Sequence, residues 1–536
     1  MILKERMQAT TKPEAWYTAV LVAIFAVGLA LRLYDLGSES LWFDELWAVR
    51  IARMEPLEII RASLGDNNPP LYYLGLHYWM LLVGDSEVAI RFPSAIASAL
   101  AVPVIYAIGT LLFGRAAGLM AALILSLSTY QIRYAQEARA YALLVFLGLT
   151  SFYFLEKCLD DEKRSRLTTA GYVASTTLLM CTHVYGILLV AAQGTYLLAT
   201  RQAPKKWLVP AGLVAVLYVP GVAWLGVNVL SSEGAWNNAM FWVPEPTFAN
   251  VVDFFIIYSG FALVAGAFGL LATFGLVELV RSKQGSTACL LLAWLLVPIV
   301  VPFVVSHLYR PMLLDRYTIA ASPAFYLLVA RGVEGLRSTK YSRVIAAVAV
   351  TAVSLAATFG YFVTTTHTPW REVASYVEEH AKPGDLVLFD EGSGKFMFDY
   401  YLQREDVTQE VATLDSSPPV TWKETQEGLA PTVEGHRRVW LVRSSWGRYP
   451  RNQKVLKRVL VRLRGAPVYS EGYHVNDAYN KKLATFRYQA NLRLLLVAEV
   501  VGYAPQGSRS MSHHELGRPH LELTRLSKHP FLKHLA

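Results

Sequence analysis

Long apolar segments separated by short polar connections dominate the first two thirds of the chain. A helix that crosses the roughly 30 Å hydrocarbon core of a membrane needs about 20 predominantly apolar residues. Eleven segments reach or approach that length, and we predict a membrane span at each of them: 16–33, 92–113, 117–131, 141–155, 167–182, 186–200, 208–227, 261–280, 290–307, 317–330 and 344–363. The pattern therefore predicts a polytopic α-helical membrane protein of about 11 transmembrane helices.

The segment Leu71–Val83 is equally apolar, but it has only about thirteen residues and contains His77. It is too short to span a bilayer, so we predict that it lies along the membrane surface as an interfacial helix. It then belongs to an outer loop at about 34–90, and this choice sets the side on which every later connection lies.

The distribution of charge supports this topology. Connections predicted to share the side of Lys4, Arg6 and Lys12 are all basic, whereas the outer connections at 183–185 and 228–260 contain no Lys or Arg. Because cytoplasmic loops carry an excess of Lys and Arg, we predict a cytoplasmic N-terminus in the inner membrane. If the short helix crossed the membrane, the two sets of connections would exchange sides.

The pattern changes after residue 363. Residues 386–389 and 439–442 are short apolar runs bounded by polar or turn residues, as buried strands are. We therefore divide the chain into a transmembrane module at 1–365, an extracytoplasmic α/β domain at 366–506 and a weakly ordered tail at 507–536.

Composition agrees with the membrane class. Of 536 residues, 54% are hydrophobic and 17% are charged, and the mean hydropathy is +0.32, whereas soluble domains carry about 25% charged residues. The net charge of +9 lies largely in the short loops, so membrane lipids are expected partners and nucleic acid is not. The three cysteines show no metal-ligand spacing.

Candidate chemistry gathers on the predicted outer side. Asp44 and Glu45 are adjacent carboxylates among aromatic residues, and five outer-side arginines run against the charge rule: Arg91, Arg133, Arg139, Arg310 and Arg316. Arginine at this boundary is favoured when it has an anionic partner. Guanidinium groups stabilise a departing phosphate, and a carboxylate can take the proton of an acceptor hydroxyl. The set therefore suits a sugar linked through phosphate to a lipid, with direct displacement that inverts the anomeric centre.

Structural interpretations of the same residues remain open. Asp44 can be an N-cap and Glu45 a solvated first-turn carboxylate. The arginines can reach lipid headgroups instead of a substrate, and Glu137 can pair with Arg133 or Arg139. His183, where a span meets water, can be a hydrogen-bonded structural residue.

Six short motifs carry a resemblance to a known superfamily: Phe43-Asp44-Glu45, Asn67 to Tyr73, Arg91-Phe92-Pro93-Ser94-Ala95, Gln136 to Tyr141, His183-Val184-Tyr185-Gly186, and Arg316-Tyr317 with Pro323. In this order and on one side, they resemble the GT-C superfamily of polyprenyl-phosphate-sugar-dependent glycosyltransferases. The resemblance is in particular to the protein O-mannosyltransferases and aminoarabinose-transferase-like enzymes, glycosyltransferase family 39 and its relatives. The resemblance covers roughly residues 16–330. The chain has Asn68-Pro69-Pro70-Leu71 where the mannosyltransferases have His-Pro-Pro and then Gly-Lys, and it lacks their large lumenal module.

The resemblance implies roles for these residues. Asp44 is the general base, Glu45 assists it or positions the acceptor, and Arg91 contacts the lipid-linked phosphate. We expect Arg139 and Arg316 to bind the same phosphate. Further contacts to substrate are expected from Asn68, Tyr72, His77, Tyr141 and His183.

The predicted function is transfer of a sugar from a polyprenyl-phosphate donor to a hydroxyl of a lipid, glycan or protein, without a required cofactor. A divalent cation held by Asp44, Glu45, His77 and His183 is an alternative that their spacing does not require. A lipid or glycolipid flippase would instead place ionisable residues near the middle of the membrane and show two related halves. A membrane-anchored binding protein acting through residues 370–506 is a third interpretation.

Overall fold

The structure is a computed structural model that describes residues 14–64, 66, 68–160, 162–201, 204–230, 243–336, 341–363, 370–389, 392–411, 431–432, 436, 439–443 and 499–503. The chain forms two compact units, one comprising 1–368 with 478–494 and the other 369–477 with 495–536. The predicted tail at 507–536 and the cations Lys4, Arg6 and Lys12 lie outside the described residues.

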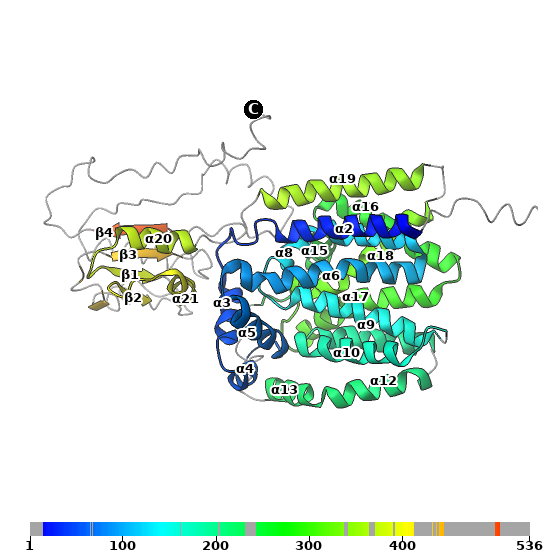
Figure 1. The fold of residues 1–536 in the computed structure, drawn as a ribbon, viewed down its shortest axis with the longest axis horizontal. Coiled ribbons are helices and arrows are strands. Elements are labelled where there is room, and N and C mark those ends of the chain that lie inside the picture. The colour runs from blue at the N-terminus through cyan, green and yellow to red at the C-terminus, as the bar shows by residue number, and fades with distance from the viewer. Residues whose placement is uncertain are drawn as a thin grey trace, which may run out of the picture. The chain divides into compact units, whose positions relative to one another are not determined.

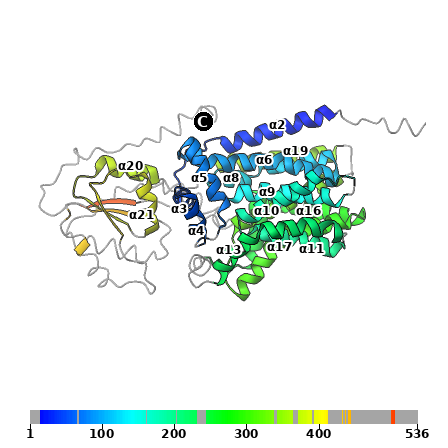
Figure 2. The ribbon, with the colours of Figure 1, turned by 60° about the horizontal axis from the view of Figure 1, so that its bottom comes forward.

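The first unit is a helical bundle. Its elements are α2 (Glu14–Leu33), α3 (Phe43–Ala52), α4 (Pro56–Ser63), α5 (Leu71–Val83), α6 (Glu87–Phe113), α7 (Arg115–Leu127), α8 (Thr129–Ala135), α9 (Tyr141–Leu159), α10 (Arg166–Thr182), α11 (Gly186–Thr200), α12 (Pro204–Leu217), α13 (Val219–Leu230), α15 (Phe248–Ser259), α16 (Ala262–Arg281), α17 (Gly285–Leu308), the 3-10 helix η1 (Asp315–Ala321), α18 (Ser322–Gly335) and α19 (Ser342–Phe362). The long helices run side by side, and α3, α4 and α5 gather at one end of the bundle (Figures 1 and 2).

Six helices of the described chain are long and apolar enough to cross a membrane: α2, α6, α9, α16, α17 and α19. The pair α12 and α13 gives a seventh if the 55° bend between them lies within one span. Pro220 at this bend has no N–H to continue the helical hydrogen bonds. The protein is therefore a multi-pass helical membrane protein. Shorter helices cover the other predicted spans, and α5, with 13 residues, is shorter than a span.

The predicted span 117–131 is broken at Ser128. The Ser128 hydroxyl caps α8 by accepting the Gln131 N–H at 3.3 Å, so the C-terminal carbonyls of α7 lose helical donors. Arg32, fully buried within the bundle, donates instead to the carbonyls of Leu125 at 3.1 Å and Ser126 at 3.0 Å. Near the end of the first span, this arginine therefore stabilises a helix break.

Small residues allow a close contact between α16 and α18. A Cβ atom on Gly275 of α16 would lie 2.3 Å from the Leu328 carbonyl oxygen, and one on Gly332 of α18 would lie 2.0 Å from that of Leu271. Only glycine permits the two backbones to approach so closely, as is common between helices in membranes.

The second unit contains α20 (Trp370–His380), β1 (Leu386–Phe389), α21 (Gly392–Tyr401), β2 (Thr408–Val411), β3 (Val439–Arg443) and β4 (Glu499–Tyr503). Its sheet has the order β2-β1-β3-β4, with β1 parallel to both neighbours and β4 antiparallel to β3. The two apolar runs predicted as strands form β1 and β3, and both are buried. The described part of this unit is therefore α/β.

Candidate active site

Asp44 lies in the first turn of α3, but it does not cap the helix. The N-cap is Trp42, and its backbone N–H is accepted by Glu45 Oε2 at 3.3 Å. The carboxylate of Asp44 remains 22% exposed, and its Oδ2 lies 3.3 Å from Arg316 Nη1. Glu45, the third residue of the helix, therefore caps its start, and the Asp44 carboxylate is left to face Arg316.

Glu45 is fully buried and acts as a structural anion. Its carboxylate accepts from Arg91 Nε and Nη2, both at 2.8 Å, and from the Ala138 backbone N–H at 2.9 Å. This forked, charge-assisted pair joins α3 to α6 and to the segment before α9.

Every N–H group of the Arg91 guanidinium donates a hydrogen bond within the protein. Besides the two bonds to Glu45, it donates through Nη1 to the carbonyls of Leu36 at 3.0 Å and Glu39 at 2.9 Å, and through Nη2 to that of Ser40 at 3.3 Å. These contacts use all five N–H groups of a guanidinium. The geometry makes Arg91 a positioning residue for the loop before α3, and it gives the predicted phosphate contact no support.

Two other arginines meet at Asp44. Arg139 Nη1 donates to the backbone carbonyl of Asp44 at 3.2 Å, and its guanidinium lies 5.8 Å from the ring centre of Tyr141. The Arg316 guanidinium lies 5.7 Å from the ring centres of both Trp42 and Tyr317. The buried Arg139 and the half-buried Arg316 thus place two positive charges beside one half-buried carboxylate.

The backbone around these arginines is held by hydroxyl and indole groups. Ser94 Oγ donates to the Arg139 carbonyl at 3.1 Å and lies 3.3 Å from the Tyr72 hydroxyl. In η1, the carbonyls of Thr318 and Ala320 accept from the Tyr258 hydroxyl at 2.9 Å and the Trp294 indole at 2.8 Å. Tyr72 therefore acts on Arg139 through Ser94, and η1 places Arg316 on a well-anchored turn.

His183 completes an aromatic wall with two tyrosines. Its ring centre lies 5.7 Å from that of Tyr141 and 5.4 Å from that of Tyr317. Because the Tyr185 backbone N–H donates to His183 Nδ1 at 3.1 Å, the neutral ring carries its proton on Nε2. Burial, together with the charges of Arg139 and Arg316, lowers the pKa of His183 to about 3.

The structure thus brings together Asp44, Arg139, Tyr141, His183 and Arg316 of the predicted residues. Tyr317 and Trp42 belong with them, but neither was predicted as a site residue. Tyr317 follows Arg316 in the sequence and Trp42 lies two residues before Asp44, and this proximity was the one sign that either could belong to the site. The sequence gives no means of telling that their rings would face Arg316.

Other predicted residues lie in supporting positions. His77 Nδ1 is 2.8 Å from the Ala52 carbonyl oxygen, a contact that joins α5 to the end of α3. Asn68 is buried before α5, and the Tyr73 hydroxyl on α5 donates to Asp66. Glu137 pairs with Arg133, with Oε1 and Nε 3.6 Å apart, which was one of the two partners considered. Within the described ranges, no three His, Cys, Asp or Glu side chains gather as a metal ion requires.

Comparison with known proteins supports the same class. The family model described as dolichyl-phosphate-mannose-protein mannosyltransferase matches residues 67–224. No curated protein shows a significant match to the sequence. The crystal structures of ArnT from Cupriavidus metallidurans, in the apo state and bound to undecaprenyl phosphate, are 14% identical, with TM-scores of 0.58 and 0.57, and each alignment covers 90% of this chain and 98% of ArnT. The oligosaccharyltransferase from Archaeoglobus fulgidus, in complex with Zn and sulfate, is 11% identical over 79% of this chain and 68% of its own, with a TM-score of 0.50.

The chain thus shares the fold of these solved structures, which is the GT-C architecture that the resemblance predicts. Within this class, residues 67–224 carry the sequence pattern of the dolichyl-phosphate-mannose-protein mannosyltransferase family.

Proposed function

We propose that this protein transfers a sugar from a polyprenyl-phosphate carrier to a hydroxyl of a lipid, glycan or protein. The observation that carries the proposal is the meeting of Asp44 with Arg316, 3.3 Å from its carboxylate, and Arg139, bonded to its backbone carbonyl. A base beside two cations is what displacement of a lipid phosphate requires. The matched family description and the ArnT complex with undecaprenyl phosphate support this donor class.

In the proposed reaction, Asp44 takes the proton of the acceptor hydroxyl as the hydroxyl oxygen forms a bond to the anomeric carbon. The bond between that carbon and the phosphate oxygen breaks, and its electron pair leaves with the phosphate. Arg139 and Arg316 stabilise the charge that develops on the phosphate. A single displacement inverts the anomeric centre. A phosphate leaving group needs no general acid, so no cofactor or metal ion is required.

Neighbouring residues prepare this site without reacting. The Glu45–Arg91 pair fixes the turn that carries Asp44, and Tyr72 acts on Arg139 through Ser94. Tyr141, Tyr317 and His183 are buried, and the two tyrosine rings pack against Arg139 and Arg316, so they hold these cations in place. These assignments revise the predicted role of Arg91 from binding phosphate to positioning.

The proposed topology keeps eleven spans, a cytoplasmic N-terminus and an extracytoplasmic second unit. Support comes from the coincidence of every predicted span with a helix or helix pair, and from the basic connections at 114–115, 156–166 and 281–283. The exposed positions Ser38 and Arg164 test it as single cysteine substitutions in a chain whose own cysteines are replaced. A membrane-impermeant maleimide should label Ser38→Cys in intact cells and Arg164→Cys only after permeabilisation. The reverse labelling would contradict the orientation.

Transfer activity tests the proposed function. Membranes containing the chain are incubated in turn with radiolabelled polyprenyl-phosphate mannose, arabinose, aminoarabinose and galacturonic acid, and label leaving the carrier is measured. Arg316→Gln should lower transfer by about 10²–10³-fold, the effect of removing one charge-stabilising donor. The control, Arg53→Gln, removes a half-exposed arginine paired with Asp85 and should leave transfer unchanged. Equal transfer by Arg316→Gln and wild type would contradict the proposed role of the cations.

A further inference from the structure

A recess lies away from the candidate active site, where the start of α2, the junction of α6 with α7 and the end of α9 meet. Its volume is about 610 Å³, and it is lined by Glu14, Tyr17, Thr18, Tyr106, Ala107, Thr110, Leu111, Arg115, Tyr153, Lys157 and Lys163. Arg91 and Thr110 are nineteen residues apart on α6, which at 1.5 Å per residue is roughly 28 Å. That separation is about the thickness of a bilayer core, so the recess opens at the opposite membrane boundary from Asp44.

The recess is basic. Three cations line it against one carboxylate, and that carboxylate, Glu14, pairs with Arg115 at 2.6 Å. Lys163 pairs with Asp160. Lys157 is different, because its ammonium lies 4.7 Å from the ring centre of Tyr153 and no carboxylate of the described residues pairs with it. A positive charge at this wall is therefore available to an anion.

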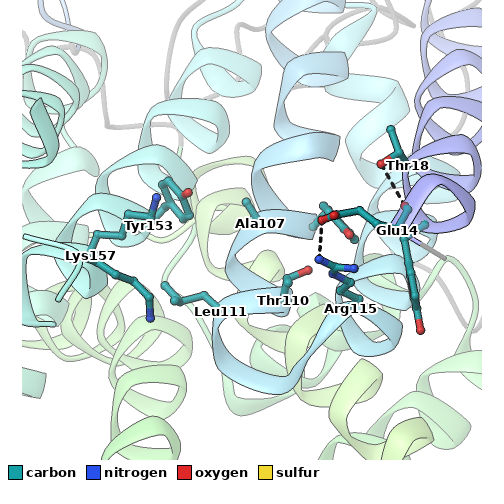
Figure 3. A pocket seen from close by; sticks show the side chains of 11 residues that line it. Glu14, Thr18, Ala107, Thr110, Leu111, Arg115, Tyr153 and Lys157 are labelled. Atoms are coloured by element: carbon teal, nitrogen blue, oxygen red, sulfur yellow. Dashed lines mark hydrogen bonds and ion pairs between the residues drawn. The ribbon is translucent and has the colours of Figure 1, made fainter. Parts of the chain in front are cut away.

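The uncharged lining of the recess combines tyrosine rings with apolar side chains, as is typical of a membrane boundary. Figure 3 shows Lys157 and Tyr153 on one side and Arg115 with Glu14 on the other, with Ala107, Thr110 and Leu111 between them. Tyrosine rings at headgroup depth are typical of the membrane interface, and the apolar floor suits the first carbons of an acyl chain. The Thr110 hydroxyl is buried and has no hydrogen-bond partner among the described residues.

We propose that this recess binds the phosphate of an anionic phospholipid from the membrane leaflet opposite the transfer site. Lys157 and Arg115 contact the phosphate oxygens, the tyrosines surround the glycerol, and the acyl chains follow α6 between α2 and α9. Basic pockets between membrane helices are suited to anionic headgroups. A free phosphate offers the same charge but does not use the apolar floor, so the lipid is the occupant that satisfies both surfaces.

Native mass spectrometry of the full chain in detergent micelles tests this proposal, with phosphatidylglycerol or phosphatidylcholine as the added probe. The first phosphatidylglycerol should bind at least about tenfold more weakly to the double variant Arg115→Gln/Lys157→Gln, since two charge-assisted contacts are lost. The conservative variant Lys157→Arg should retain wild-type affinity. The matched control, Arg166→Gln/Arg281→Gln, removes two exposed cations outside the recess and should also bind as wild type does.

Three results would overturn the proposal. The double variant and wild type would bind phosphatidylglycerol equally, or phosphatidylcholine would bind the wild type as tightly, or excess sn-glycerol 3-phosphate would displace the lipid and show a soluble phosphate site instead. Thermal unfolding of each variant identifies loss of fold. Because none of the substituted residues belongs to the transfer site, failure here is distinct from failure of the proposed function.

Discussion

The buried pair of Glu45 and Arg91 offers a sharp test of the difference between a structural and a substrate-binding arginine. We predict that Glu45→Gln destabilises the protein by roughly 3–5 kcal/mol, the cost of removing one member of a buried ion pair. Glu45 accepts bonds from Arg91, from Ala138 and from Trp42, and its side chain is fully buried. A glutamine has one acceptor oxygen instead of two, so at least one of these donors meets an amide N–H. The guanidinium of Arg91 also loses its counter-ion.

Equilibrium chemical unfolding in detergent micelles, followed by tryptophan fluorescence, measures this change in the free energy of unfolding. Arg91→Gln should destabilise by a similar amount, and the double variant should lose clearly less than the sum of the two, with a coupling of about 2 kcal/mol. The control is Asp85→Asn, which breaks the half-exposed pair with Arg53 and should cost less than about 1 kcal/mol. If both single variants unfold as the wild type does, and Arg91→Gln weakens only the binding of undecaprenyl phosphate, Arg91 contacts phosphate and the positioning role is wrong.

Three further predictions follow from other parts of the structure. Burial lowers the pKa of His183 to about 3 in the folded protein, against an ordinary 6.5, so the unfolded chain takes up the proton first as the pH falls. Between pH 7 and pH 5 the free energy of unfolding of the wild type should therefore fall by about 2 kcal/mol more than that of His183→Gln. Equal losses would show that His183 is not buried as a neutral ring. Gly332→Ala should lower the free energy of unfolding by roughly 1–3 kcal/mol, because the added methyl group forces α18 away from α16. The control Gly269→Ala on α16 places its methyl group in open space and should leave the thermal unfolding midpoint unchanged. Equal midpoints for the two variants would refute the close contact. Chelation by EDTA should leave transfer unchanged, and a loss restored by a divalent cation would contradict the metal-free reaction.

Much of the bundle could be predicted from hydropathy and charge. The 13-residue Leu71–Val83 is too short to cross on length alone, and two short apolar runs bounded by polar or turn residues predicted strands β1 and β3. The break at Ser128 could not be predicted, because it depends on Arg32, nearly a hundred residues earlier, supplying donors to the freed carbonyls. A local sequence pattern carries no information about a partner that distant in the chain.

The sequence predicted which residues gather at the candidate active site better than it predicted what each of them does there. Asp44, Arg139 and Arg316 meet as expected from residues that share one membrane face. Arg91 shares that face too, yet its five donors are all used by Glu45 and by loop carbonyls. Whether an arginine at the boundary faces a ligand or a buried carboxylate is decided by tertiary packing, so sequence position could not separate Arg91 from Arg316.

The central claim is that Asp44 is the base of a transfer reaction and does not itself hold the carrier. The measurement that tests it most directly compares Asp44→Asn with wild type for two quantities in the same preparation, affinity for undecaprenyl phosphate and the rate of sugar transfer. We predict affinity within about twofold and transfer lower by about 10²–10⁴-fold, the contribution of a positioned general base. Full transfer by Asp44→Asn at normal membrane expression would contradict the claim.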